Sequence, residues 1–163
     1  MTAAITKRLV VATVVAGVLA GTSALGHCEI PCGIYGDRTR VDLLKEHCQT
    51  IEKSMQQITS LQTEPEENAN QLVRWVMNKE EHANKIQDIV YQYFMNQRVK
   101  PVEKSDAEAY EHYVTQITLL HRMLVTSMKC KQTTDATHVR HLRTLLSDFE
   151  KAYFTEDKHT HGH

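Results

Sequence analysis

The residues best suited to chemistry stand in one short segment near the N-terminus, His27-Cys28-Glu29-Ile30-Pro31-Cys32-Gly33-Ile34-Tyr35. If His27 begins the mature chain, its free amine, the amide nitrogen of Cys28 and the Cys28 thiolate close two fused chelate rings on one metal ion. Fused rings of this kind favour a planar arrangement, and the Cys32 thiolate can supply the fourth corner. The segment therefore predicts a square-planar site with two nitrogen and two sulfur ligands.

This donor set indicates which metal the site would take. A square plane suits Ni(II) or Cu(II), whereas zinc prefers a tetrahedron. Thiolates and a deprotonated amide are electron-rich, so they stabilise a higher oxidation state. The imidazole of His27 can then add as an axial ligand when the metal is oxidised. The segment predicts a redox-active ion.

Three neighbouring residues fit the same interpretation. Pro31 restricts the turn that must bring the thiolates of Cys28 and Cys32 together. Gly33 permits a backbone conformation that is closed to other residues. Tyr35 could place its phenol over the open face of the metal and control access to it.

The free amine depends on removal of residues 1–26, which are typical of a targeting segment. Lys7 and Arg8 precede an apolar run that extends to about Leu19, and small residues lead up to Gly26. Cleavage after Gly26 would expose the amine of His27. We expect a signal peptide and export to a periplasm or the exterior; a processed propeptide in the cytoplasm is the alternative. An uncleaved membrane anchor is less favoured because the apolar run is short.

The pattern His-Cys-x-x-Pro-Cys-Gly-x-Tyr resembles the nickel hook of the nickel-containing superoxide dismutase family. The resemblance continues more loosely through Arg40-Val41-Asp42 and through Thr50-Ile51-Glu52-Lys53-Ser54-Met55. It implies one nickel ion per subunit, bound by His27, Cys28 and Cys32 and gated by Tyr35.

The resemblance also implies roles for residues outside the hook. Asp42 falls near a family carboxylate that orients the axial imidazole, and Tyr93 corresponds to a second tyrosine at the site. Asn78 stands where the family has a basic partner of the imidazole, so the sequence departs from the pattern there.

The activity implied by the resemblance is disproportionation of superoxide to dioxygen and hydrogen peroxide, with nickel cycling between the divalent and trivalent states. The same resemblance implies a homohexamer of four-helix bundles and a maturation peptidase that removes the leader. A metal-binding or metal-delivery protein that holds nickel or copper without turnover is the rival interpretation.

Periodicity independently predicts an all-α fold, an antiparallel four-helix bundle over residues 37–155 preceded by the metal-binding hook over residues 27–36. Apolar residues recur at helical spacing in four segments separated by short breaks. The predicted inward residues are Val41, Leu44, Cys48, Ile51, Met55 and Ile58; Leu72, Val76, Ala83, Ile86, Val90 and Tyr93; Tyr113, Ile117, Leu120, Leu124 and Met128; and Val139, Leu142, Leu146, Phe149 and Tyr153. Asp37 or Thr39 could cap the first helix, Pro65 suits the first turn of the second, and Ser105 or Asp106 could cap the third.

The charge of the chain limits which binding partners are expected. The formal net charge of -1 comes from 19 basic and 20 acidic residues mixed along the chain, which disfavours nucleic acid. We expect no stable membrane association after cleavage.

Residues 156–163 form a His-rich tail that we expect to be disordered. Taken alone, Cys28 and Cys32 would suit a disulfide in an exported protein, and a bond between Cys48 and Cys130 is a further alternative.

Overall fold

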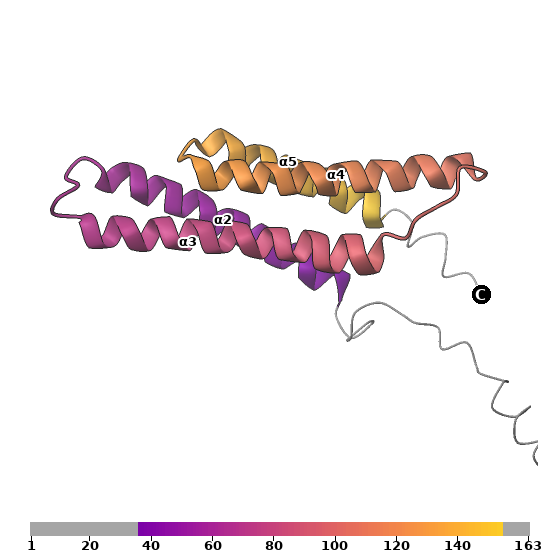
Figure 1. The fold of residues 1–163 in the computed structure, drawn as a ribbon, viewed down its shortest axis with the longest axis horizontal. Helices are drawn as coiled ribbons and strands as arrows, with labels where there is room; N and C mark the ends of the chain where they lie inside the picture. The colour runs from indigo at the N-terminus through magenta and orange to yellow at the C-terminus, as the bar shows by residue number, and fades with distance from the viewer. Residues whose placement is uncertain (1–35, 155–163) are drawn as a thin grey trace, which may run out of the picture.

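The computed structural model describes residues 36–154, and within that range the chain folds into helices without any strand. The helices are α2 (Asp37–Leu61), α3 (Ala69–Asp88), η1 (Ile89–Arg98), α4 (Ala107–Gln132) and α5 (Ala136–Phe154) (Figure 1). The leader, the hook residues 27–35 and the His-rich tail lie outside the described residues.

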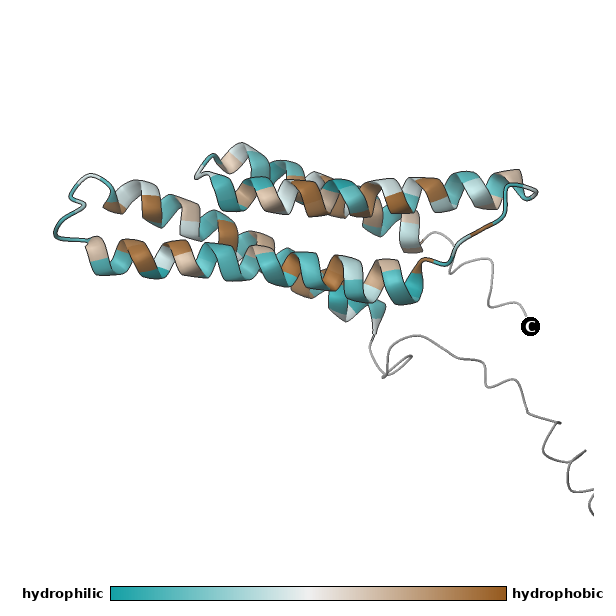
Figure 2. Cartoon of the chain, in the orientation of Figure 1, coloured by the Kyte–Doolittle hydropathy of each residue, from teal (hydrophilic) through white to brown (hydrophobic). Residues whose placement is uncertain are grey.

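The helices form two antiparallel hairpins that lie side by side. Figure 1 shows α2 beside α3 and α4 beside α5, with the loops of both hairpins at the same end of the bundle. Hydrophobic and hydrophilic residues alternate around each helix in Figure 2, as amphipathic helices of a bundle require. The predicted all-α bundle is confirmed over the described residues.

The predicted core stripe of the first helix is confirmed, and that of the last helix is confirmed except at Tyr153, which is only partly buried. All six predicted positions on α2, from Val41 to Ile58, are buried, as are Val139, Leu142, Leu146 and Phe149 on α5. The other two stripes are partly wrong. Val76 on α3 is 40% exposed and Met128 on α4 is 44% exposed.

The error on α4 has a simple origin in the composition of the helix. Its fully buried face runs through Gln116, Leu120, Met123, Ser127 and Cys130, and therefore includes polar residues that hydropathy places outside. An adjacent stripe that includes Leu124 and Met128 is more apolar, so periodicity selects the wrong face. Packing of α4 against its neighbours decides the rotation instead.

Local polar contacts set several helix boundaries. Asp106 accepts a hydrogen bond from the backbone N of Ala109 at 3.1 Å, so the predicted cap of α4 is confirmed. Asp37 does not cap α2, because no side-chain cap bond is made there. The start predicted for α3 at Pro65 is also wrong: the Asn68 side chain donates to the carbonyl of Glu64 at 3.0 Å within a turn, and the helix begins at Ala69.

The segment η1 is a π-helix that continues α3 directly. It ends with a bond from the backbone N of Val99 to the carbonyl of Phe94 at 2.8 Å, an i→i+5 contact. Such spacing brings residues five apart, among them Tyr93 and Arg98, onto the same side of the helix. Single turns of π-helix occur often at functional sites.

Cys48 and Cys130 are free thiols buried in the core. Burial raises the pKa of Cys48 to about 12 and that of Cys130 to about 11. Both therefore stay protonated at neutral pH and act as small apolar core residues. None of the described helices combines the length and apolar character needed to cross a membrane.

An aromatic group holds the end of the bundle where α2 begins. Phe94 meets Phe149 at a centroid distance of 4.9 Å and Tyr153 at 5.4 Å, both edge to face. Phe149 in turn stacks on Tyr153 at 5.3 Å. Because Phe149 is fully buried, it fixes both partners.

We predict that Phe149→Ala lowers the free energy of unfolding by about 3–5 kcal/mol, because it removes a buried ring and leaves a cavity. Chemical denaturation of the full chain would measure the loss. The matched control is Lys53→Ala on the exposed side of α2, for which we expect a change within about 0.5 kcal/mol. Equal effects of the two substitutions would contradict the packing described here.

Candidate metal centre and the side chains at its base

The hook enters the bundle at the first residue of α2. Gly36 and Asp37 follow directly on the segment His27–Tyr35, so the bundle end that carries Asp37 is the base of the predicted metal site. The structure therefore describes the part of the chain that supports the predicted site. The predicted ligands His27, Cys28 and Cys32 lie outside the described residues. The same is true of Gly26, Pro31, Gly33 and Tyr35.

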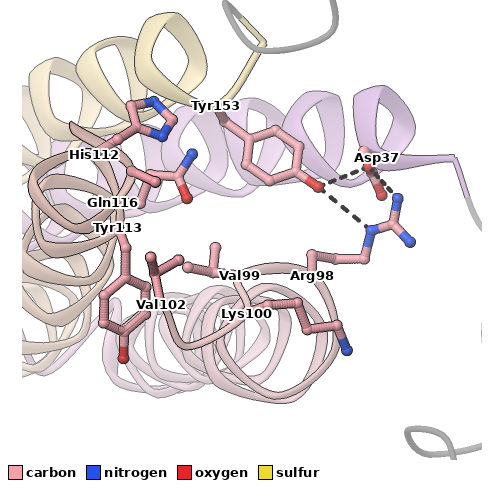
Figure 3. A pocket seen from close by; sticks show the side chains of 10 residues that line it. Asp37, Arg98, Val99, Lys100, Val102, His112, Tyr113, Gln116 and Tyr153 are labelled. Atoms are coloured by element: carbon pink, nitrogen blue, oxygen red, sulfur yellow. Dashed lines mark hydrogen bonds and ion pairs between the residues drawn. The ribbon is translucent and has the colours of Figure 1, made fainter. Parts of the chain in front are cut away.

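Asp37 is the centre of a hydrogen-bonded cluster that joins three elements. Its Oδ1 accepts from the hydroxyl of Tyr93 on η1 at 2.5 Å. Its Oδ2 accepts from the Arg98 guanidinium at 2.6 Å and from the hydroxyl of Tyr153 on α5 at 2.8 Å. Figure 3 shows Arg98 and Tyr153 converging on Asp37. We call these four residues the Asp37 cluster.

The π-helix explains how one carboxylate reaches two donors from η1. Tyr93 and Arg98 are five residues apart, a spacing that an α-helix turns to different sides and that i→i+5 bonding brings together. Both side chains therefore point at the start of α2. Asp37, which the sequence analysis considered as the cap of the first helix, therefore binds these donors instead.

The cluster fixes the protonation states of its members. Burial raises the pKa of the Asp37 carboxyl, but hydrogen bonds from Arg98, Tyr93 and Tyr153 outweigh it and hold that pKa below its usual value of 3.8. Burial and the bond to Asp37 raise the pKa of Tyr93 to about 12, and the same causes raise the pKa of Tyr153. At neutral pH the carboxylate is charged and both phenols keep their protons.

Guanidinium groups surround this end of the bundle. The Arg40 guanidinium carbon lies 5.4 Å from the centroid of the Tyr93 ring, and that of Arg98 lies 5.9 Å from it. Arg38 stands over the Phe154 ring at 4.2 Å. Arg98 pairs with Asp37 at 2.6 Å and Arg38 pairs with Glu150 at 3.4 Å, so guanidinium groups and carboxylates lie together at the bundle end that carries Asp37.

A cavity of about 280 Å³ opens beside the cluster, between η1, α4 and α5 (Figure 3). Asp37, Arg98 and Tyr153 line one side of it, and Gln116 and His112 line the other. His112 Nε2 contacts the carbonyl of Ala152 at 2.8 Å. The buried Nε2 of Gln116 has no hydrogen-bond partner among the described residues, so the inner end of the cavity is polar.

The other predicted site residues lie apart from the cluster. Asp42 is 61% exposed on α2 and pairs with Lys45 at 3.5 Å; its role toward the His27 imidazole stays a prediction. Asn78 donates to the Ser54 hydroxyl at 2.9 Å between α3 and α2. Residues 36–154 contain no group of three or more His, Cys, Asp or Glu side chains placed to hold a metal ion.

Of the four residues of the Asp37 cluster, the sequence analysis named only Tyr93 as a candidate site residue, and its role at the metal stays a prediction. Arg98 and Tyr153 are 61 and 116 residues from Asp37 along the chain, and no local pattern connects them. One feature of the sequence could have identified Asp37 as a functional residue, namely its position directly after the hook.

We predict that Asp37→Asn lowers the free energy of unfolding at pH 7 by about 1–3 kcal/mol, because the side chain is only 17% exposed and charge-assisted bonds are lost. The folded-state pKa of Asp37 is depressed, so its contribution is present above the unfolded pKa and is lost as pH falls through the folded value. Denaturation of both proteins between pH 7 and pH 2 should show the difference shrinking below about pH 4. A difference that does not change with pH would contradict an ionised, bonded Asp37.

The family model described as nickel-containing superoxide dismutase matches residues 22–158, which include both the hook segment and all the described helices. No curated protein and no solved structure gave a match. With most of its length matched, the chain belongs to the nickel-containing superoxide dismutase family.

Proposed function

We propose that this nickel superoxide dismutase holds its metal through His27, Cys28 and Cys32 after removal of residues 1–26. The family membership gives the activity and the nickel cofactor. The observation that carries the proposed ligand set is the segment His27–Tyr35, which lies inside the matched range and joins the bundle at the Asp37 cluster. Its amine, amide and thiolate donors fit nickel in a square plane.

When bound, nickel supplies a one-electron couple between its divalent and trivalent states. The chain's own part is to orient donors, to attract superoxide and to provide protons, since each hydrogen peroxide formed takes up two. Tyr35 is proposed to control access to the site. Pro31 and Gly33 are proposed to shape the turn between the two cysteines.

Tyr93 is the one described member of the Asp37 cluster that the family resemblance assigns to the site. Its phenol stays protonated at neutral pH. The hydroxyl donates a hydrogen bond to the Asp37 carboxylate, which sets the direction of the O–H group. Tyr93 is therefore proposed as the second tyrosine of the site, with Asp37 as its positioning residue. Asp42 keeps its proposed role toward the His27 imidazole.

The arginines near Asp37 are proposed to attract an anionic substrate, with Arg38 and Arg98 held in place by Glu150 and Asp37. Superoxide carries one negative charge, and Arg38, Arg40 and Arg98 lie around the first turn of α2. Because the formal net charge of the chain is -1, attraction must come from such a local group rather than from the whole molecule. The rival interpretation as a nickel or copper delivery protein gains no support from the family match.

Assembly and processing are further parts of the proposal. A homohexamer is supported by apolar side chains that the single chain leaves exposed, Val73, Val76 and Met77 on α3 and Val125 and Met128 on α4. We propose that a maturation peptidase cuts between Gly26 and His27. Export directed by the leader is the favoured localisation, with a processed cytoplasmic propeptide as the alternative.

Intact mass, metal content and superoxide turnover of one purified sample test the proposal together. We expect a chain that begins at His27, carries one nickel ion per subunit and turns over superoxide. A chain that retains its leader, or that carries a bond between Cys28 and Cys32 and no metal, would contradict the proposed site.

We predict that extending the mature N-terminus by one residue before His27 abolishes turnover, because the α-amine ligand becomes an amide. The helical circular dichroism and the melting temperature should stay unchanged, since the hook lies outside the bundle. The matched control adds one residue after His163 instead. Full activity in the N-terminally extended protein would exclude the amine as a ligand.

We predict that Tyr93→Phe lowers kcat about a hundredfold, the lower end of the range expected when a group positioned for proton transfer is removed. Tyr153→Phe is the matched control, because it also removes one hydroxyl bonded to Asp37, at 2.8 Å, from the same cluster. We expect Tyr153→Phe to keep most activity. Equal losses of kcat in the two variants would assign both tyrosines a purely structural role.

A further inference from the structure

Two histidines from neighbouring helices meet outside the Asp37 cluster. His47 lies ten residues after Asp37 on α2, and His82 lies on α3. Their Nδ1 atoms are 3.1 Å apart, with ring centroids 4.9 Å apart and the rings nearly perpendicular. The pair belongs neither to the Asp37 cluster nor to the cavity beside it.

In the metal-free protein this contact is a hydrogen bond between two neutral rings. Burial, then the nearby charges of Lys85 and the opposing ring, lower the pKa of His47 to about 4, and burial followed by Lys85 lowers the pKa of His82. One Nδ1 donates and the other accepts. Core packing of α2 on α3 through Cys48 and Ala83, the next residue on each helix, holds the two rings together.

The separation of the two nitrogen atoms matches that of adjacent ligands on one metal ion. With metal–nitrogen bonds of about 2.0–2.1 Å, two imidazole nitrogens lie about 2.9 Å apart at a right angle and about 3.4 Å apart at a tetrahedral angle. The observed 3.1 Å falls between these values. An ion bound by both nitrogens would replace the hydrogen bond, and each ring would turn so that its Nδ1 lone pair points at the ion.

We propose that His47 and His82 form a second metal site, which binds a divalent ion of the borderline class, zinc, nickel or copper, through both Nδ1 atoms. Imidazole is a preferred ligand of these ions. Both residues are half-buried, so solvent can reach the ion and complete its coordination. Binding requires both rings to carry their proton on Nε2.

Nearby charge limits the affinity of this site. Lys85 repels a cation, but its Nζ is paired with the Glu81 carboxylate at 2.6 Å, which offsets part of the repulsion. With two protein ligands, we expect binding weaker than at the hook. Because the ligands come from α2 and α3, a bound ion links the two helices and stabilises the folded chain.

The test uses zinc as the probe and the full chain carrying Cys28→Ser and Cys32→Ser, which removes the hook thiolates. Calorimetric titration counts zinc ions, and thermal unfolding measures stability with and without zinc. We expect His47→Asn and His82→Asn each to lose one zinc equivalent and a zinc-dependent rise in Tm of about 3 °C or more. The matched control is His121→Asn on the exposed side of α4, which should lose neither. The tail histidines are present in every variant and so contribute equally.

A second measurement does not depend on how the variants fold. In the background protein labelled with ¹⁵N at histidine, zinc should shift the Nδ1 resonances of His47 and His82 together. Unchanged resonances at zinc concentrations that saturate the chain would overturn the proposal, as would equal zinc binding by folded His82→Asn and the background protein.

Discussion

The ionised carboxylate of Asp37 is the contact on which the arrangement of this end of the molecule depends. It accepts hydrogen bonds from η1 and α5 while belonging to the first turn of α2, so one side chain joins three of the described elements. It also follows directly on the hook, residues 27–36. The point at which the chain enters the bundle is therefore held by short, charge-assisted hydrogen bonds.

The π-helix is the backbone feature that makes this contact possible. A regular α-helix through residues 89–98 would direct Tyr93 and Arg98 to different sides, and one carboxylate could not accept from both. The weaker hydrogen-bond geometry of a π-helix must be offset by other contacts. Phe94 on η1 packs against Phe149 and Tyr153 on α5. The same ring therefore stabilises η1 and fixes Tyr153, which donates a hydrogen bond to Asp37.

Sequence reasoning succeeded where the signal is local and failed where it depends on packing. The hook donors are close in sequence, so their chemistry can be deduced without a fold. The α2 stripe is strongly apolar and was predicted in full, but on α4 the buried face contains Gln116 and Ser127, and hydropathy favoured the adjacent face. The partnership of Asp37 with Arg98 and Tyr153 depends on an i→i+5 turn and on a contact across the bundle. Neither feature has a sequence pattern.

The two metal sites proposed for this chain, at the hook and between His47 and His82, depend on the fold to different degrees. The proposed hook ligands, His27, Cys28 and Cys32, come from one continuous segment, so their chemistry does not depend on bringing distant parts of the chain together. The ligands proposed at His47 and His82 are 35 residues apart in sequence and meet only when α2 packs on α3. An ion at the hook should therefore change reactivity with little effect on the bundle, whereas an ion between the two helices must add to the stability of the fold, because only the folded chain holds both rings in place.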